Sequence, residues 1–169
     1  MQYANAQEKQ QTHSFHLKSD DIQDGALIEN EQVYNASGCR GENISPSLSW
    51  SSPPEGSKSF AITLYDPDAP KEGGFWHWIA FNIPAGTQHL SKGTLPESVV
   101  EIKNDYGNHG YGGPCPPRGD SPHRYILTVY ALDIERIPLD SQATIQQALL
   151  HIEQHQLAKD SITAQYGQS

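Results

Sequence analysis

Apolar residues concentrate in three segments whose composition is typical of β-strands. Residues 60–65 (FAITLY) and 124–132 (RYILTVYAL) are rich in β-branched and aromatic side chains, and residues 75–83 (FWHWIAFNI) are apolar at nearly every position. Strands that are apolar on both faces lie between two layers, as in the interior of a sandwich. Shorter strands are predicted at 47–50, where apolar and polar residues alternate, and at 161–166.

One helix is predicted between the last two of these strands. Apolar side chains recur there at helical spacing, at Ile145, Ala148, Leu149 and Ile152. Either Asp140 or Ser141 can serve as its N-cap. The 12 Pro and 14 Gly residues are spread along the chain, which favours short strands and turns over a helical bundle. We therefore expect a mainly β fold, an antiparallel Greek-key-like β-sandwich with a C-terminal helix at its edge.

The chain has 169 residues, a length that suits one domain. We expect a single domain over residues 14–169 and a flexible N-terminal segment over residues 1–13, because that segment is polar. The net charge of −9 argues against nucleic acid or an anionic membrane surface as a partner, since both attract basic patches. No apolar run approaches the roughly 18 residues of a membrane-spanning helix, so a soluble protein with no integral membrane segment is expected.

The two cysteines, Cys39 and Cys115, lie in separate loops that are rich in Gly and Pro. One disulfide between them would stabilise the loops by restricting the unfolded chain, and two unrelated thiols are the alternative. Ala4-Asn5-Ala6 has the small-x-small form of a signal-peptidase site, although no apolar stretch precedes it. Together with a Cys39–Cys115 bridge, this motif favours a periplasmic or otherwise exported location over a cytoplasmic one.

The segment from Asn104 to Pro122 contains too much Gly and Pro for a helix or an interior strand. Compact domains seldom keep loops longer than about a dozen residues without a use for them. Because this loop ends at His123, where a strand begins, it predicts a shaped rim that leads polar side chains into a pocket.

His77 is the polar exception on one face of the predicted strand 75–83. Counting with a period of two places five side chains on one face: Phe75, His77, Ile79, Phe81 and Ile83. A lone histidine in such a stripe is more often a core residue than a ligand-binding group. Its position near the start of the strand, where strands open onto loops, favours a role in binding instead.

Three further polar residues could converge with His77. Asp66 ends the preceding strand, and the turn-forming segment 66–70 (DPDAP) would bring it to the same end of the sheet. His123 and Tyr125 lie two residues apart at the start of another strand, so they share a face. Together the four side chains would supply a carboxylate, two imidazoles and a phenol, which combine acceptors with switchable donors.

Two separated motifs resemble the phosphatidylethanolamine-binding protein family, also called the Raf-kinase-inhibitor-like family. The first is DPDAP at 66–70 with FWHW at 75–78, and the second is GYGGPCPPRG at 110–119 with HRY at 123–125. The segment CRGENISP at 39–46 and the cysteine of the second motif resemble the bacterial branch of that family.

The resemblance implies a β-sandwich with a small anion pocket, and it implies a homodimer, because bacterial members are often dimers. The positions that match the family's pocket are Asp66, Pro70, His77, Pro117, His123 and Tyr125, and the backbone of Gly112 and Gly113 would shape its wall. We therefore hypothesise a non-enzymatic protein, with no metal or other cofactor, that binds a phosphorylated headgroup or another phosphate-bearing ligand and can regulate a partner protein.

In this hypothesis the donors to phosphate are protonated His77 or His123, the Tyr125 hydroxyl and loop N–H groups. Asp66 would accept an ammonium group or orient a histidine. Two alternatives remain open. One is a kinase or protease inhibitor that acts through its rim loops, and the other is a metal-assisted or acid/base hydrolase. Against the hydrolase, the sequence has neither an HExxH nor a GxSxG motif.

Overall fold

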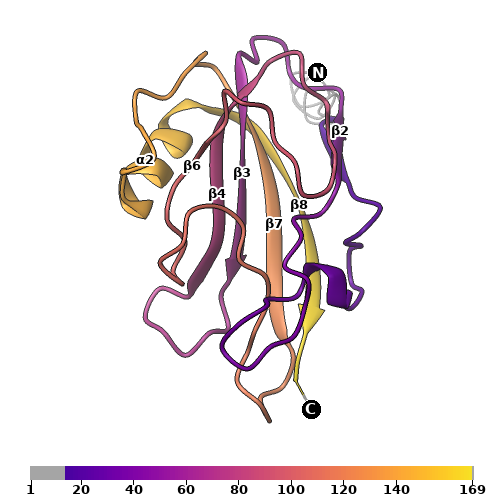
Figure 1. The fold of residues 1–169 in the computed structure, drawn as a ribbon. Coiled ribbons are helices and arrows are strands. Elements are labelled where there is room, and N and C mark those ends of the chain that lie inside the picture. The colour runs from indigo at the N-terminus through magenta and orange to yellow at the C-terminus, as the bar shows by residue number, and fades with distance from the viewer. Residues whose placement is uncertain (1–13, 169) are drawn as a thin grey trace, which may run out of the picture.

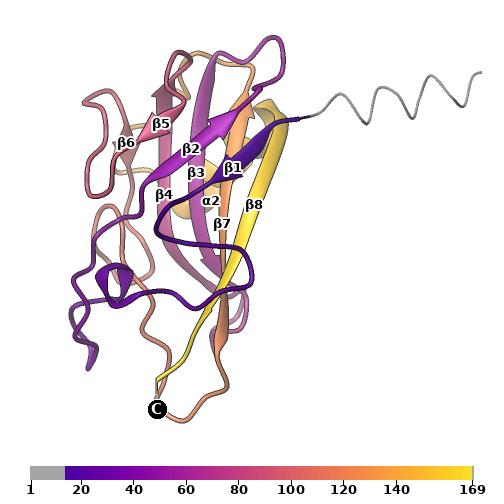
Figure 2. The same cartoon turned by 90° about the vertical axis from the view of Figure 1, so that its right-hand side faces the viewer.

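The computed structural model describes residues 14–168, and its strands form two antiparallel sheets (Figure 1). The larger sheet has the order β6-β4-β3-β7-β8. Its strands, in that order, are Val100–Glu101, Phe75–Pro84, Ser59–Asp66, His123–Leu132 and Gln156–Tyr166. The smaller sheet has the order β1-β2-β5, with strands His16–Lys18, Leu48–Ser51 and His89–Leu90. Figure 2 shows the smaller sheet in front of the larger one, which confirms the predicted antiparallel β-sandwich.

The main core lies between the two sheets. Trp50 of β2 packs against Phe60 of β3 with 5.2 Å between the ring centroids, and the buried Leu64 and Trp78 join the same cluster. Burial of one such side chain stabilises the fold by about 1.5–3 kcal/mol relative to exposure. The strands predicted to be apolar on both faces are therefore those that carry this core.

The helix α2 (Ile145–His155) covers the outer face of the larger sheet. Its Ala148 and Ile152 are buried in a second apolar cluster with Ile79 and Phe81 of β4. Figure 2 shows α2 behind the larger sheet, on the side away from the smaller one. The apolar stripe predicted from the sequence is the face of the helix that packs on the sheet.

The two ends of α2 differ from the sequence prediction. Thr144 is the N-cap, since its Oγ1 accepts a hydrogen bond from Gln147 N at 3.1 Å and Gln147 Oε1 accepts one from Thr144 N at 2.9 Å. This capping box satisfies two N–H groups of the first turn, so the prediction of Asp140 or Ser141 is wrong. The chain then enters β8 directly, before the predicted start at 161, because β8 pairs with β7 along nearly all of its length.

A β-bulge in β4 changes the position of His77. The successive residues Leu64 and Tyr65 of β3 pair with Trp78 and Trp76, so His77 is an extra residue between them. Consecutive side chains of a regular strand point to opposite faces, and a bulge breaks this alternation. Here the His77 ring and the side chain of its neighbour Trp78 both lie on the inner side of the sheet.

A second register shift in β4 lies near Asn82, whose φ of 63° is in the left-handed region. Between the two shifts Ile79 and Phe81 face α2, whereas Ile83 belongs to the inner cluster. The predicted common face of His77, Ile79, Phe81 and Ile83 is therefore wrong, because the alternation is interrupted twice.

The loop before β2 and the loop before β7 are joined by a disulfide between Cys39 and Cys115. Close backbone packing holds the same two loops together, with Tyr34 N donating to Pro114 O at 3.0 Å. Gly113 is required at this contact, since a Cβ there would overlap the carbonyl oxygen of Gln32. The rim predicted from the sequence is thus fixed to a second loop far away in the chain.

Residues 1–13, predicted to be a flexible segment and including Ala4-Asn5-Ala6, lie outside the described residues. Among residues 14–168, none of the helices has the length and hydropathy of a membrane-spanning segment. The helix α2 has 11 residues.

Candidate functional site

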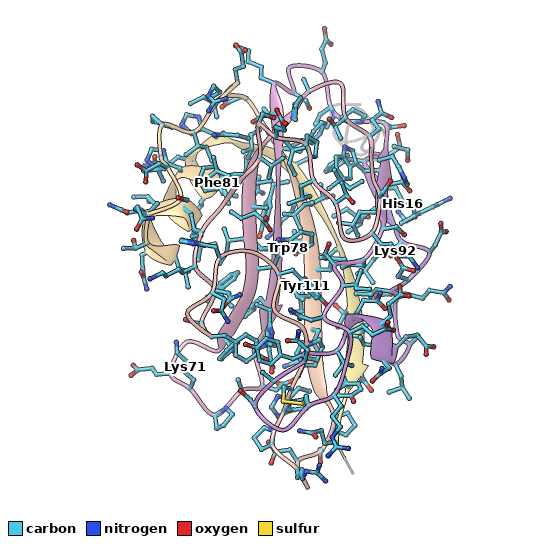
Figure 3. All side chains as sticks on the ribbon, viewed as in Figure 1. His16, Lys71, Trp78, Phe81, Lys92 and Tyr111 are labelled. Carbon is cyan, nitrogen blue, oxygen red and sulfur yellow. A yellow bond between two sulfur atoms is a disulfide. The ribbon has the colours of Figure 1, made fainter. Side chains whose placement is uncertain are left out.

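A cavity of about 270 Å³ lies at the end of the larger sheet where β3 ends and where β4 and β7 begin. Its wall contains the four polar side chains and the two prolines predicted for the pocket: Asp66, Pro70, His77, Pro117, His123 and Tyr125. Figure 3 shows Lys71, another lining residue, at the same end of the molecule as the disulfide. The other lining residues are Ala69, Phe75, Tyr106, Cys115 and Pro116.

The bulged residue His77 is held by two hydrogen bonds to Gly112. Its carbonyl accepts from Gly112 N at 2.9 Å, and its Nδ1 lies 2.8 Å from Gly112 O. Because a carbonyl oxygen can only accept, Nδ1 carries the proton. Nε2 then presents a lone pair, and it makes no hydrogen bond to any residue from 14 to 168.

The His77 side chain is neutral at physiological pH. Burial lowers its pKa from 6.5 to about 4, although the hydrogen bond to Gly112 and the charge of Asp66 act in the opposite direction. The expectation that protonated His77 supplies a donor is therefore wrong. His77 offers the pocket an acceptor.

His123, the first residue of β7, lies between two carboxylates. Its Nδ1 is 2.7 Å from Asp66 Oδ2, and its Nε2 is 3.0 Å from Asp120 Oδ2. Both partners are acceptors, so both ring nitrogens donate and the ring is an imidazolium. Burial lowers the pKa of His123, but the two carboxylates outweigh burial and raise the pKa above its usual value. Of the two histidines in this pocket, His123 carries the positive charge.

Asp66 orients His123, which is one of the two roles expected for it. This last residue of β3 is 2% exposed, and its Oδ1 accepts a hydrogen bond from Asp68 N at 2.8 Å. Asp68 itself pairs outside the cavity with Arg124 through two side-chain hydrogen bonds of 2.8 and 3.0 Å. These bonds lower the pKa of Asp68 to about 2. The turn after β3 is thus tied to the start of β7, which fixes Asp66 against His123.

Tyr125 places a hydroxyl group in the pocket that makes no hydrogen bond of good geometry with residues 14–168, although the Asp66 carboxylate lies close enough to raise its pKa. The residue is 1% exposed, and its ring lies 5.3 Å from the ring of His77 and 6.5 Å from that of His123. Burial and then the charge of Asp66 raise the pKa of Tyr125, so it stays protonated. A buried polar group without a partner is rare in native proteins and points to a ligand that could satisfy it.

Gly112 and Gly113 do not form the anion nest that their sequence suggested. Gly112 N donates to His77 O, and Gly113 N donates to Asn43 Oδ1 at 2.7 Å. Neither amide is free for an anion, and neither residue lines the cavity. The expectation of donors from this loop is wrong because its N–H groups are used to hold His77 and the neighbouring loop.

The sequence prediction missed Tyr106, which forms an apolar wall of the cavity. Its ring packs edge-on against Phe75 at 4.7 Å and against His77 at 5.4 Å, and it stacks on Tyr34 at 3.8 Å between centroids. The Asn104 side chain fixes the turn by accepting from Tyr106 N at 2.9 Å. An aromatic residue just after Asn-Asp in a Gly-rich loop is the signal that could have indicated it.

The sequence prediction also missed Asp120 and Lys71. Asp120 lies three residues before His123 in the chain, a spacing that could have indicated their pairing. Lys71 lies at the mouth of the cavity and pairs loosely with Asp105 at 3.6 Å. Within the described residues 14–168, no group of three or more His, Cys, Asp and Glu side chains is arranged to hold a metal ion.

Sequence comparison places relatives of this chain in bacteria. The UPF0098 protein YbhB of Escherichia coli strain K12 is 44% identical over 156 residues, which cover 89% of this chain and 98% of YbhB. The UPF0098 protein YbcL of the same organism is 43% identical over 163 residues, which cover 92% of this chain and 89% of YbcL.

Solved structures agree with these relatives. The crystal structure of E. coli YbcL, described as a new member of the mammalian PEBP family, has a TM-score of 0.90 and 41% identity, covering 92% of this chain and 99% of that one. A putative phosphatidylethanolamine-binding protein homologue of Chlamydia trachomatis, CT736, has a TM-score of 0.80 and 31% identity over the same shares. The family model described as phosphatidylethanolamine-binding protein matches residues 18–167. The chain therefore belongs to the phosphatidylethanolamine-binding protein family, in its bacterial branch.

Proposed function

We propose that this protein binds a small phosphorylated ligand in the cavity at the end of the larger sheet, and that it does so without catalysing a reaction. The observation that carries the proposal is the position of the buried His123 ring, whose nitrogens lie 2.7 Å from Asp66 Oδ2 and 3.0 Å from Asp120 Oδ2, an arrangement that favours the imidazolium. Phosphate oxygens accept their strongest hydrogen bonds from charged donors of this kind. The unpartnered Tyr125 hydroxyl beside it supplies a second donor.

The lone pair on His77 Nε2 limits which phosphorylated ligands can bind in the cavity. Nε2 needs a hydrogen-bond donor, which a phosphate monoester can bring as its P–OH group, since its second pKa is about 6. An ammonium group can also donate to His77 or to Asp66. Phosphoethanolamine carries both kinds of donor, and its two methylene groups fit the apolar wall formed by Phe75 and Tyr106. A cavity of about 270 Å³ suits a headgroup of this size.

The protonation of the two histidines supports binding over catalysis. A general base works best when its pKa lies near the working pH, and His77 has a pKa of about 4. Both nitrogens of His123 donate to carboxylates, so neither can take a proton from a nucleophile. Stoichiometric zinc or manganese in the purified protein, together with turnover of a phosphate ester, would instead favour the hydrolase.

Replacement of His123 by Asn is expected to weaken phosphoethanolamine binding at least about tenfold, because a charge-assisted hydrogen bond contributes about 1.5–3 kcal/mol. Isothermal titration calorimetry near the ordinary histidine pKa of about 6.5 measures the effect. His155→Asn is the matched control, since His155 pairs with Asp133 at 2.9 Å at the other end of β7. Its affinity should equal that of the unmodified protein.

The same titration over a range of pH needs no variant. Because the pKa of His123 is raised, the part of the affinity that His123 supplies should hold near pH 6.5 and be lost as the pH rises through that raised value, above the pH of about 6 at which the ligand loses its own P–OH proton. An affinity that does not change with pH, or an unaltered affinity in folded His123→Asn, would remove the imidazolium from the proposed site.

A further inference from the structure

The two N–H groups of His123 are held very differently. The Nδ1 partner, Asp66, is buried, and its carboxylate accepts hydrogen bonds from both His123 and Asp68 N. The Nε2 partner, Asp120, has a side chain that is 42% exposed, and its contact with His123 is the only hydrogen bond that its carboxylate makes with residues 14–168. A ligand can therefore reach a charged donor only on the Asp120 side, where Asp120 and His123 line an open hollow that shares His123 with the cavity.

The charges around His123 oppose an added anion. Asp66 and Asp120 contribute two negative charges and His123 one positive charge, so the cluster has a net charge of −1. Lys71 is half-exposed and is itself paired with Asp105. A phosphate placed on Nε2–H beside an unmoved Asp120 would meet a like charge within hydrogen-bond distance. If Asp120 moves into solvent, the remaining Asp66–His123 pair is neutral.

The segment that carries Asp120, residues 117–120, is an exposed turn that two long backbone hydrogen bonds hold, one from Asp120 N to Pro117 O at 3.3 Å and one from Gly119 N to Gln168 O at 3.4 Å. Gly119 has a φ of 88°, and no atom lies within 4 Å of where its Cβ would be. Pro117 lines the cavity, so the turn that carries Asp120 begins at the cavity wall.

We propose that the Asp120 carboxylate competes with the ligand's phosphate for the Nε2–H group of His123 and acts as a gate that the phosphate must displace. This inference rests on the proposed phosphate-binding function. The gate also makes the site selective for phosphate over carboxylate ligands. A ligand carboxylate is no better an acceptor than the Asp120 carboxylate that it would have to displace. A phosphate monoester, with more acceptor oxygens and more charge, displaces it.

The test compares the unmodified protein with Asp120→Asn and Asp120→Ala, using phosphoethanolamine at about pH 6, where an ordinary histidine is charged. Both variants should bind about tenfold more tightly, the size of effect expected when a partly exposed charge-assisted contact no longer competes. Asp120→Ala should also gain measurable binding of acetate. The matched control is Asp133→Asn, because Asp133 is 50% exposed and pairs with His155. It should leave the affinity unchanged.

Two-dimensional NMR on the unmodified protein gives a second measurement that does not depend on a variant. The Asp120 and His123 signals should shift together, with one midpoint, as phosphoethanolamine is added. Equal or weaker affinity in the Asp120 variants, or an Asp120 signal that does not move, overturns the gate and leaves the proposed function standing. Absence of saturable binding in the unmodified protein and in all three variants overturns both the gate and the proposed function.

Discussion

Reduction of the Cys39–Cys115 disulfide should lower the free energy of unfolding by about 4 kcal/mol, the largest effect on stability that we expect from a single bond in this protein. The two cysteines are 76 positions apart, so the bridge closes a long loop and restricts the unfolded chain strongly. Urea denaturation with and without a reductant measures the difference, with the slope of the transition checked for a change in the unfolded state.

The double variant Cys39→Ala/Cys115→Ala is the control for this measurement. Its urea midpoint should match that of the reduced protein and should not respond to reductant. Because Cys115 lines the cavity, both forms should also bind phosphoethanolamine more weakly than the oxidised protein. Identical midpoints before and after reduction would mean that backbone packing between the two loops, such as the contact of Tyr34 with Pro114, suffices without the bridge.

Acidification from pH 6.5 to 4 should cost the fold about 3 kcal/mol through His77 alone. Burial lowers the pKa of this residue from 6.5 to about 4. Between these values the unfolded chain binds a proton at residue 77 and the folded chain does not, so stability falls as the pH falls. The measurement is the slope of the free energy of unfolding against pH, for the unmodified protein and for His77→Asn.

The Asn variant keeps an N–H group near the position of Nδ1, so it can still donate to Gly112, and its slope should be shallower over this interval. Other titratable groups change the free energy of unfolding outside this pH interval. Because the pKa of His123 is raised, its stabilising contribution is complete below pH 6.5 and is lost at higher pH. The pKa of Asp68 is lowered to about 2, so its contribution is lost only below the interval. Parallel slopes for the two proteins would show that His77 is not buried in its neutral form.

The strands were predictable because burial on both faces leaves a strong composition signal. The segments 60–65 and 75–83 are apolar at nearly every position, and each lies in a central strand. The bulge at His77 was not predictable, because it contains no glycine and depends on the pairing of β3 with β4 and on the hydrogen bonds of Gly112. Capping at Thr144 was missed because Asp140 and Ser141 also have side chains that suit an N-cap.

The sequence predicted which polar residues line the candidate site. It did not predict which of the two histidines is protonated. Asp66, His77, His123 and Tyr125 do line one cavity. Which histidine carries the charge depends on the groups next to each ring in the folded structure, and the spacing of residues in the sequence does not reveal these groups. His77 meets a carbonyl in a buried place, whereas His123 meets a carboxylate on each ring nitrogen. Asp120, which completes this arrangement, lies in a turn with no signal beyond its distance from His123 in the sequence.

The most direct test of the proposed function is a two-dimensional NMR titration, first with inorganic phosphate and then with phosphoethanolamine, observing the ring signals of His77, His123 and Tyr125. We predict saturable shifts confined to the residues that line the cavity, at lower concentrations of phosphoethanolamine than of phosphate. The His77 Nδ1–H signal should persist, because its bond to Gly112 remains. A well-folded protein whose cavity signals do not move at any concentration of either ligand would contradict the proposal that this pocket binds phosphate.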